Sequence, residues 1–275
     1  MQFTIDRPGQ VRLAGEEAGE GRPVVLLHGL TATRRYVVHG SKALERSGHR
    51  VISYDARGHG HSSPAADAEG YGYGELTEDL EAVLDQLNIE RAVIAGVSMG
   101  AHTLLSFGLR HPDRVAGLVA ITPAYSGDAA LERTRLERWD RLAAGLRAGG
   151  IEGFVSAYEL PPAMPPAIAA TVLTVIRQRL ALQEHPAALA DALQVVPRSA
   201  PFSLISDLAA LKMPVTIVAS NDEHDPEHPE AVARAYADTI HDAELITDRP
   251  GRSPVAWQGS QISKVIAATA ARAFG

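Results

Sequence analysis

The chain has no cysteine among its 275 residues. This absence excludes disulfide bonds, zinc sites built on thiolates and a cysteine nucleophile, and it leaves the redox compartment open. No stretch approaches the roughly 18 uninterrupted apolar residues that a membrane-spanning helix needs. The first residues lack the basic segment and the long apolar run of a secretion signal. We therefore expect a cytoplasmic protein without a membrane partner.

Lysine is scarce as well, since only three of the 26 basic side chains are lysine, and the arginines are dispersed among 33 acidic residues. A net charge of −7 without a basic patch argues against nucleic acid as a partner. The apolar content of 45% and the charged content of 21% are typical of globular proteins. The length fits one α/β domain with an insertion, and we see no internal repeat.

Short apolar runs alternate with longer amphipathic segments along much of the chain. This alternation is typical of βαβ units around a parallel sheet. We predict strands at 24–27, 50–54, 92–95, 115–121, 214–219 and 243–246, and helices at 41–47, 75–87, 101–109 and 262–274.

Strand signals disappear between residues 124 and 208, where the pattern is helical and a Pro-rich stretch at 160–166 divides it. Helical material inserted between two strands cannot join their sheet. We therefore predict an α/β core of residues 1–123 and 209–275, with residues 124–208 forming a helical lid. A lid over the carboxyl ends of parallel strands would cover the region where such sheets bind ligands.

A G-x-S-x-G pattern, Gly96-Val97-Ser98-Met99-Gly100, follows one apolar run and precedes a helical segment. A strand that turns sharply into a helix forces strained dihedral angles on the central serine, so its neighbours must be small. Such a turn raises the Ser98 hydroxyl above the sheet, beside a helix N-terminus that favours developing negative charge. Ser98 is therefore the candidate nucleophile.

This elbow is accompanied by His28-Gly29 at the end of an earlier strand and by the pattern Asp-x-Arg-Gly-x-Gly-x-Ser at 55–62. From about Gly19 to the C-terminus the chain resembles the lid-bearing α/β-hydrolase superfamily. The resemblance implies a mostly parallel sheet flanked by helices and a hydrolase that acts on a small-molecule ester or a related acyl or C–O bond. It implies no cofactor.

The resemblance also assigns roles to individual residues. In superfamily members two backbone amides hold the oxyanion, and these positions correspond to Leu30 and Met99. His28 corresponds to a residue that orders the loop after the first strand. Epoxide hydrolases and dehalogenases of the superfamily carry Asp at the elbow, so Ser98 disfavours those activities.

Two carboxylates are candidates for the acid. Superfamily members commonly carry Asp followed four residues later by Pro, and Asp225 with Pro229 matches this pattern. Asp222 lies nearer the end of the predicted strand and is the alternative. The same loop holds His224 and His228, but it lacks the i, i+4 histidine pair of a helical metal site. We therefore expect no metal there.

The residue at the expected position of the catalytic base is Arg252. Residues 250–254 read Pro-Gly-Arg-Ser-Pro, where relatives carry Pro-Gly-His or a similar run before Ser-Pro. A guanidinium stays protonated and offers no lone pair. No histidine follows His241, which precedes the last predicted strand, at the end far from the site. One hypothesis is therefore an Asp225–Arg252 ion pair in a ligand-binding protein or in an altered enzyme with lyase-like or isomerase-like chemistry.

The other hypothesis is a serine hydrolase with an atypical triad, in which a different histidine serves as the base. His228, on the acid loop, is the best placed by sequence. His102 lies one helical turn after Ser98 and is expected to pack between helix and sheet. His39, His59 and His61 lie on loops near the strand ends.

Two arginines follow the predicted oxyanion loop. Arg34 is a candidate pocket residue beside His28, where it could bind a carboxylate. Arg34 and Arg35 are otherwise expected to be ordinary surface residues. The sequence identifies neither the substrate nor the oligomeric state.

Overall fold

The computed structural model describes residues 1–127, 129–162, 164–221, 225, 227–247 and 254–275, with only the backbone of 129–132. The strands are β1 (Gln2–Asp6), β2 (Arg12–Ala18), β3 (Arg22–Leu27), β4 (His49–Tyr54), β5 (Ala92–Val97), β6 (Val115–Ile121), β7 (Val215–Val218) and β8 (Glu244–Ile246). The helices are α1 (Ala43–Arg46), α2 (Tyr73–Gln86), α3 (Met99–Arg110), α4 (Ala129–Ala157), α5 (Pro166–Leu180), α6 (Pro186–Val195), α7 (Glu230–Thr239) and α8 (Gly259–Phe274). None of the helices in these ranges combines the length and the hydropathy needed to cross a membrane.

All eight strands form one sheet in the order β1-β2-β4-β3-β5-β6-β7-β8. The strands from β4 to β8 in this order pair in parallel, whereas β1 pairs antiparallel with β2, and β2 antiparallel with β4. The predicted α/β-hydrolase fold with a mostly parallel sheet is confirmed. The two antiparallel strands at the N-terminal edge are additional to the predicted ones.

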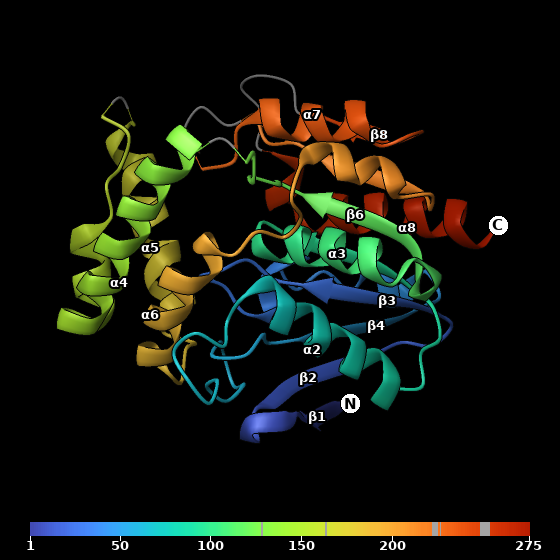
Figure 1. The fold of residues 1–275 in the computed structure, drawn as a ribbon, viewed down its shortest axis with the longest axis horizontal. Coiled ribbons are helices and arrows are strands. Elements are labelled where there is room, and N and C mark those ends of the chain that lie inside the picture. Colours follow the sequence, from blue (N-terminus) through green and yellow to red (C-terminus); the bar gives the residue numbers. More distant parts are fainter. Residues whose placement is uncertain (128, 163, 222–224, 226, 248–253) are drawn as a thin grey trace.

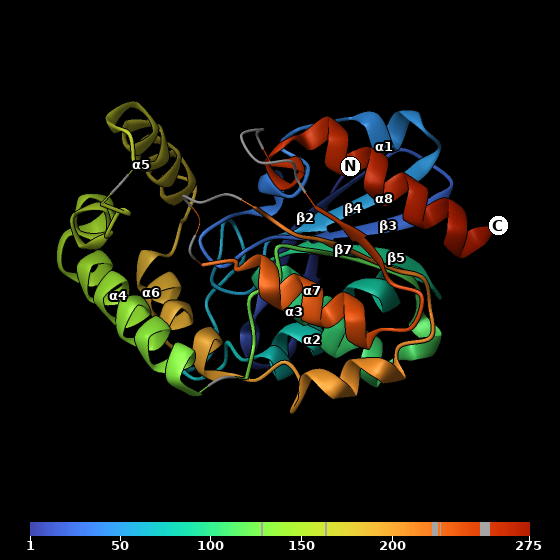
Figure 2. The ribbon, with the colours of Figure 1, turned by 90° about the horizontal axis from the view of Figure 1, so that it is seen from above.

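Helices cover both faces of the sheet (Figure 2). Side chains of a strand point alternately to opposite faces. Val25 and Leu27 of β3 accordingly pack in one buried cluster with α2, α3 and α7, whereas Val24 and Leu26 pack in a second cluster with α1 and α8. This double burial explains why the central strands are continuous apolar runs.

The helices α4, α5 and α6, which we call the insertion, lie beyond one end of the sheet (Figure 1). A third buried cluster joins them to the core at the carboxyl ends of the strands. In it Leu30, Ala56 and Met99, which follow β3, β4 and β5, pack with Leu142 of α4 and Leu189 of α6. The insertion therefore covers the carboxyl ends of the central strands, where the elbow lies. The boundaries at residues 124 and 208 and the role of the insertion as a lid stay predictions.

Candidate active site

Ser98 joins β5 to α3 with strained backbone angles, φ 51° and ψ −110°. The turn leaves no room for side chains on its flanks. A Cβ on Gly96 would lie 2.4 Å from the carbonyl of Gly100, and a Cβ on Gly100 would lie 2.3 Å from the carbonyl oxygen of Leu27. Both distances are far inside van der Waals contact, so the glycines of the motif allow the helix to approach the sheet this closely.

An imidazole lies beside the half-buried Ser98 hydroxyl. His228 Nε2 is 3.0 Å from Ser98 Oγ, and His228 Nδ1 is 2.8 Å from Asp225 Oδ2. The carboxylate accepts a hydrogen bond from the N–H at Nδ1, which leaves the lone pair of Nε2 directed at the hydroxyl. The first hypothesis from the sequence, in which no histidine serves as the base of the nucleophile, therefore does not match this geometry. The alternative left open for His228 is the one that the geometry supports.

The carboxylate and the imidazole come from one tight turn between β7 and α7. The backbone N–H of His228 donates to the carbonyl of Asp225 over 3.5 Å, which brings residues three apart onto the same side of the loop. Pro229 follows as the N-cap residue of α7, with extended φ and ψ angles of −60° and 129°. The loop that ends β7 thus supplies both groups.

The surroundings of Asp225 keep it ionised. Burial opposes the charge, but the charge and the hydrogen bond of His228 outweigh it and hold the pKa of Asp225 below its ordinary value. The positive charge of Arg138, on α4, acts in the same direction. Arg138 Nη1 also donates to Glu227 Oε1 over 2.5 Å, within the same loop. The insertion therefore contacts the acid–base loop directly.

Two backbone amides are placed to receive an oxyanion. Neither Leu30 N–H nor Met99 N–H donates to any acceptor in the part of the chain described. Gly29 lies against the nucleophile, because a Cβ built on it would be 3.6 Å from the Cβ of Ser98. His59 Nε2 lies 2.7 Å from the carbonyl oxygen of Leu30, in the peptide group that follows the oxyanion N–H, and so helps to hold this residue in place. The predicted oxyanion residues thus border the elbow.

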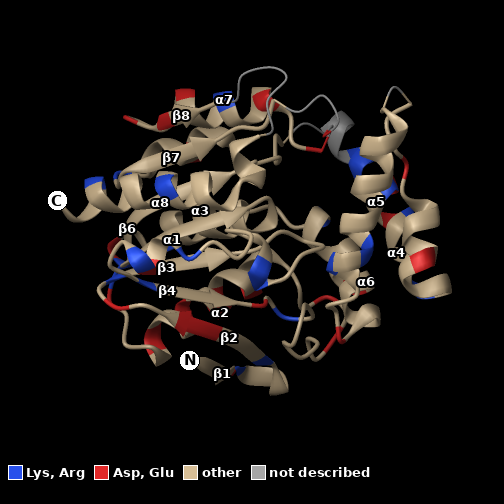
Figure 3. Ribbon diagram, turned by 180° about the vertical axis from the view of Figure 1, so that it is seen from behind, with Lys and Arg blue, Asp and Glu red and all other residues tan. Residues whose placement is uncertain are grey.

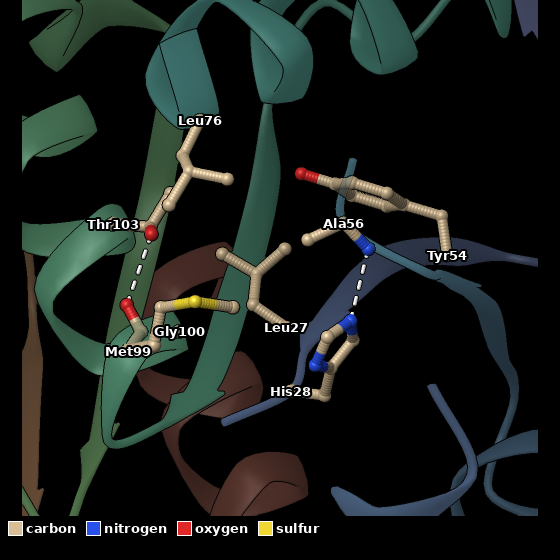
Figure 4. Close-up of a pocket in the computed structure, with 8 residues that line it drawn as sticks. All are labelled: Leu27, His28, Tyr54, Ala56, Leu76, Met99, Gly100 and Thr103. Carbon is tan, nitrogen blue, oxygen red and sulfur yellow. Dashed lines mark hydrogen bonds between the residues drawn. The ribbon is translucent and has the colours of Figure 1, made fainter. Parts of the chain in front are cut away.

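His28 links the loop after β3 to the loop after β4. Its Nε2 accepts a hydrogen bond from the backbone N–H of Ala56 over 2.9 Å, and its Nδ1 donates to Gly29 over 2.9 Å. Figure 4 shows the ring beside Leu27 and below Ala56, at a small apolar cavity. Burial, followed by the nearby His59, lowers the pKa of His28 to about 4, so the ring is neutral.

The other candidate histidines have partners of their own. His102 is buried, accepts hydrogen bonds from the backbone N–H groups of Ala124 and Tyr125, and bonds the hydroxyl of Tyr73. The ring thus links α3 to the start of α2 and to the loop after β6. His61 bonds Glu184 over 2.6 Å at the surface. Neither ring is bonded to Ser98.

The expectation that Arg34 is a surface residue is wrong. Its side chain is only 7% exposed and forms an ion pair with the fully buried Asp55. Its backbone N–H donates to the same carboxylate over 2.8 Å. Arg34 lines a cleft of about 200 Å³, but Asp55 already neutralises its charge, so it is not a free carboxylate receptor. Arg35 is exposed, as expected.

Two predicted site residues, Asp222 and Arg252, lie outside the described residues. The Asp225–Arg252 pair therefore stays a prediction. Among the described residues, Asp225 pairs with His228. Among the described residues, no three His, Cys, Asp or Glu side chains gather as metal ligands would. The sequence reasoning missed the contact between Arg138 and Glu227, because an arginine on a helix rich in charges gives no signal of its partner.

The family model described as the alpha/beta hydrolase fold matches residues 22–163. Among curated proteins, epoxide hydrolase B of Mycobacterium tuberculosis is 38% identical over 108 residues, which are 39% of this chain and 30% of that protein. The alignment thus spans less than a third of this curated relative. A carboxylesterase structure from Nitrososphaera gargenis matches with a TM-score of 0.81 at 20% identity, covering 98% of both chains. A thermophilic esterase from Thermogutta terrifontis matches with a TM-score of 0.77 at 23% identity over the full length of both.

Proposed function

Because the chain belongs to the α/β-hydrolase fold family, we propose that it is a serine hydrolase that cleaves an ester or a related acyl bond of a small molecule. The observation that carries the proposal is the chain of contacts from Ser98 through His228 to Asp225, with N···O distances of 3.0 and 2.8 Å. This is the arrangement that activates a serine hydroxyl at neutral pH.

In the first half of the reaction, Ser98 Oγ attacks the carbonyl carbon of the ester while His228 Nε2 takes the hydroxyl proton. The imidazolium that forms is stabilised by the ionised Asp225. The negative charge that develops on the carbonyl oxygen is held by the amides of Leu30 and Met99. The imidazolium then returns its proton to the leaving alcohol, and an acyl-serine remains.

In the second half, water attacks the acyl-serine. His228 removes a proton from this water, the oxyanion forms again at the same two amides, and Ser98 leaves with the proton from the imidazolium. The products are a carboxylic acid and the free enzyme. Every proton transfer thus uses one nitrogen of one residue, so no role in this cycle is left for an arginine at position 252.

The similarity to an epoxide hydrolase suggests a second activity, which the elbow disfavours. Opening an epoxide through a covalent ester needs a carboxylate nucleophile, whose second oxygen leaves a carbonyl that water can attack. Alkylation of Ser98 would instead give an ether, which water does not cleave under such conditions. The serine, paired with an imidazole, is suited to acyl transfer.

A serine-directed fluorophosphonate and a p-nitrophenyl ester test this proposal. We expect the wild type to be labelled and Ser98→Ala to be unlabelled. His228→Ala should lower kcat by about 10⁴ to 10⁶, and Asp225→Asn by up to about 10⁴. His241→Gln is the matched control, because His241 is an exposed histidine that pairs with Asp242. It should retain wild-type kcat.

One result would remove His228 from the mechanism. If His228→Ala is labelled and turns over at the wild-type rate while it stays folded, the base lies elsewhere. A large gain of activity in Arg252→His, together with an inactive wild type, would instead indicate that the chain is an altered relative without a working base.

A further inference from the structure

Arg179 occupies the last turn of α5, at the edge of the insertion that faces the core. Its guanidinium lies over the ring of Tyr36, 5.1 Å from the centroid, in the segment that follows the oxyanion loop. Asp225 of the acid–base loop and Tyr158 at the end of α4 are among its electrostatic neighbours, and its charge in turn acts on His39. Arg179 is thus surrounded by the three segments that border the site.

Basic and acidic residues lie close together on α4, α5 and α6 (Figure 3). Most arginines of the insertion have a carboxylate partner. The pairs are Arg138–Glu227, Arg141–Glu159, Arg147–Asp191 and Arg177–Glu152, and Arg198, just after α6, pairs with Asp140 of α4.

Arg179 differs from these residues. Among the described residues, no carboxylate lies within 4.0 Å of it and no acceptor takes a hydrogen bond from it. Its Nε is fully enclosed without a partner. In the part of the chain described, the two terminal nitrogens donate no hydrogen bond either, so the guanidinium keeps N–H donors for a ligand.

A largely buried charge without a counter-ion is costly, and buried charges are normally paired. Burial lowers the pKa of Arg179, and its charged neighbour Asp225 is already bonded to His228. The guanidinium carbon lies over the ring of Tyr36, and an aromatic ring takes the place of no carboxylate acceptor. Two parallel N–H donors match the two oxygens of a carboxylate.

We propose that Arg179 binds a carboxylate of the substrate, so that the substrate class is an ester or lactone that carries a free carboxylate group. This inference rests on the proposed function, since it concerns the substrate of the same site. It assigns to Arg179 the part that the sequence suggested for Arg34, whose charge Asp55 already neutralises.

Matched pairs of chromogenic esters test the substrate class. The mono-p-nitrophenyl esters of succinate, glutarate and adipate are compared with the p-nitrophenyl esters of butyrate, valerate and hexanoate, which have a methyl group in place of the carboxylate. We expect wild type to favour the anionic ester at one chain length or more. Arg179→Gln should lower kcat/KM for that ester about 10- to 100-fold, mainly through KM, and change the neutral ester by less than about threefold.

Arg177→Gln is the control, because Arg177 lies on the same helix and is paired with Glu152. It should leave the preference unchanged. Arg179→Lys, which keeps the charge but not the planar fork, should retain part of it. The inference is overturned if Arg179→Gln changes both esters of each pair equally, or if wild type shows no preference at any of the three lengths.

Direct binding separates this inference from the proposed function. Calorimetric titration of glutarate into Ser98→Ala needs no turnover, and we expect the additional change Arg179→Gln to weaken the binding at least tenfold. If glutarate does not bind Ser98→Ala, or binds both variants equally, the carboxylate site does not exist. Failure of phosphonate labelling with intact glutarate binding would instead refute the hydrolase and leave the site standing.

Discussion

The contact between Arg138 of α4 and Glu227 of the acid–base loop gives a quantitative prediction. The side chains are only 15% and 20% exposed, and their N···O distance is 2.5 Å. Two unit charges about 4 Å apart attract by about 4 kcal/mol at an effective dielectric constant of about 20. Desolvation and lost side-chain entropy oppose this attraction. We therefore expect a net coupling of about 1–2 kcal/mol.

A double-mutant cycle measures this coupling. Arg138→Met and Glu227→Gln each leave one partner unpaired, so each should lower the free energy of unfolding and displace the loop that holds His228. We expect kcat/KM to fall about tenfold in each single variant, and little further in the double variant. Urea unfolding gives the first quantity, and hydrolysis of p-nitrophenyl valerate gives the second.

The control cycle uses Arg141 and Glu159, a pair on the same insertion whose side chains are 47% and 70% exposed. Solvent screens such pairs, so their coupling should stay below about 0.5 kcal/mol, and kcat/KM should not change. The reasoning is refuted if the effects of Arg138→Met and Glu227→Gln simply add, or if the exposed pair couples as strongly as the enclosed one.

Two further predictions concern stability. Burial lowers the pKa of His28 to about 4 in the folded protein. As the pH falls, His28 is therefore protonated in the unfolded chain before it is protonated in the folded one. The contribution of the neutral His28 to the free energy of unfolding is therefore complete above about pH 6.5, and about 3 kcal/mol of it is lost as the pH falls from about 6.5 to 4. Urea unfolding at several pH values across this range measures the loss. The same pH profile in His28→Gln would contradict the prediction. Gly100→Ala should cost at least about 1–3 kcal/mol, because the added methyl group would lie 2.3 Å from the carbonyl oxygen of Leu27. Gly74→Ala, with open space around the new methyl group, should not destabilise the protein, and equal thermal unfolding of the two variants would contradict the steric argument.

Most strands that could be predicted from the sequence are buried on both faces; β8, at the far edge of the sheet, is the exception. Val24 to Leu27 form such a run, because helices cover the sheet on both sides. β1 and β2 escaped prediction for the opposite reason. They lie at the edge of the sheet, and β2 buries only Leu13 and Gly15 among seven residues that include two glutamates. A short polar segment of this kind gains its strand conformation from pairing with β4 and not from its own composition.

The nucleophile could be predicted because local strain demands a local pattern, with small residues on both sides of Ser98. The base could not be identified by the same means. An imidazole can reach Ser98 from any loop at the carboxyl ends of the strands. The position of a histidine along the chain therefore does not identify it as the base. His228 stood out only as a histidine three residues from the predicted acid, whereas Arg252 occupied the position that the resemblance assigned to the base.

Placing acid and base on one loop changes what the insertion can control. Where the two groups lie on separate loops, each is held by its own neighbours. Here a displacement of one short turn moves Asp225 and His228 together, and that turn is held from α4 by the enclosed pair Arg138–Glu227. The relative geometry of acid and base is then conserved when the turn moves, while the distance from His228 to Ser98 changes. Weakening that pair should therefore slow the attack of the hydroxyl without releasing the imidazole from its carboxylate.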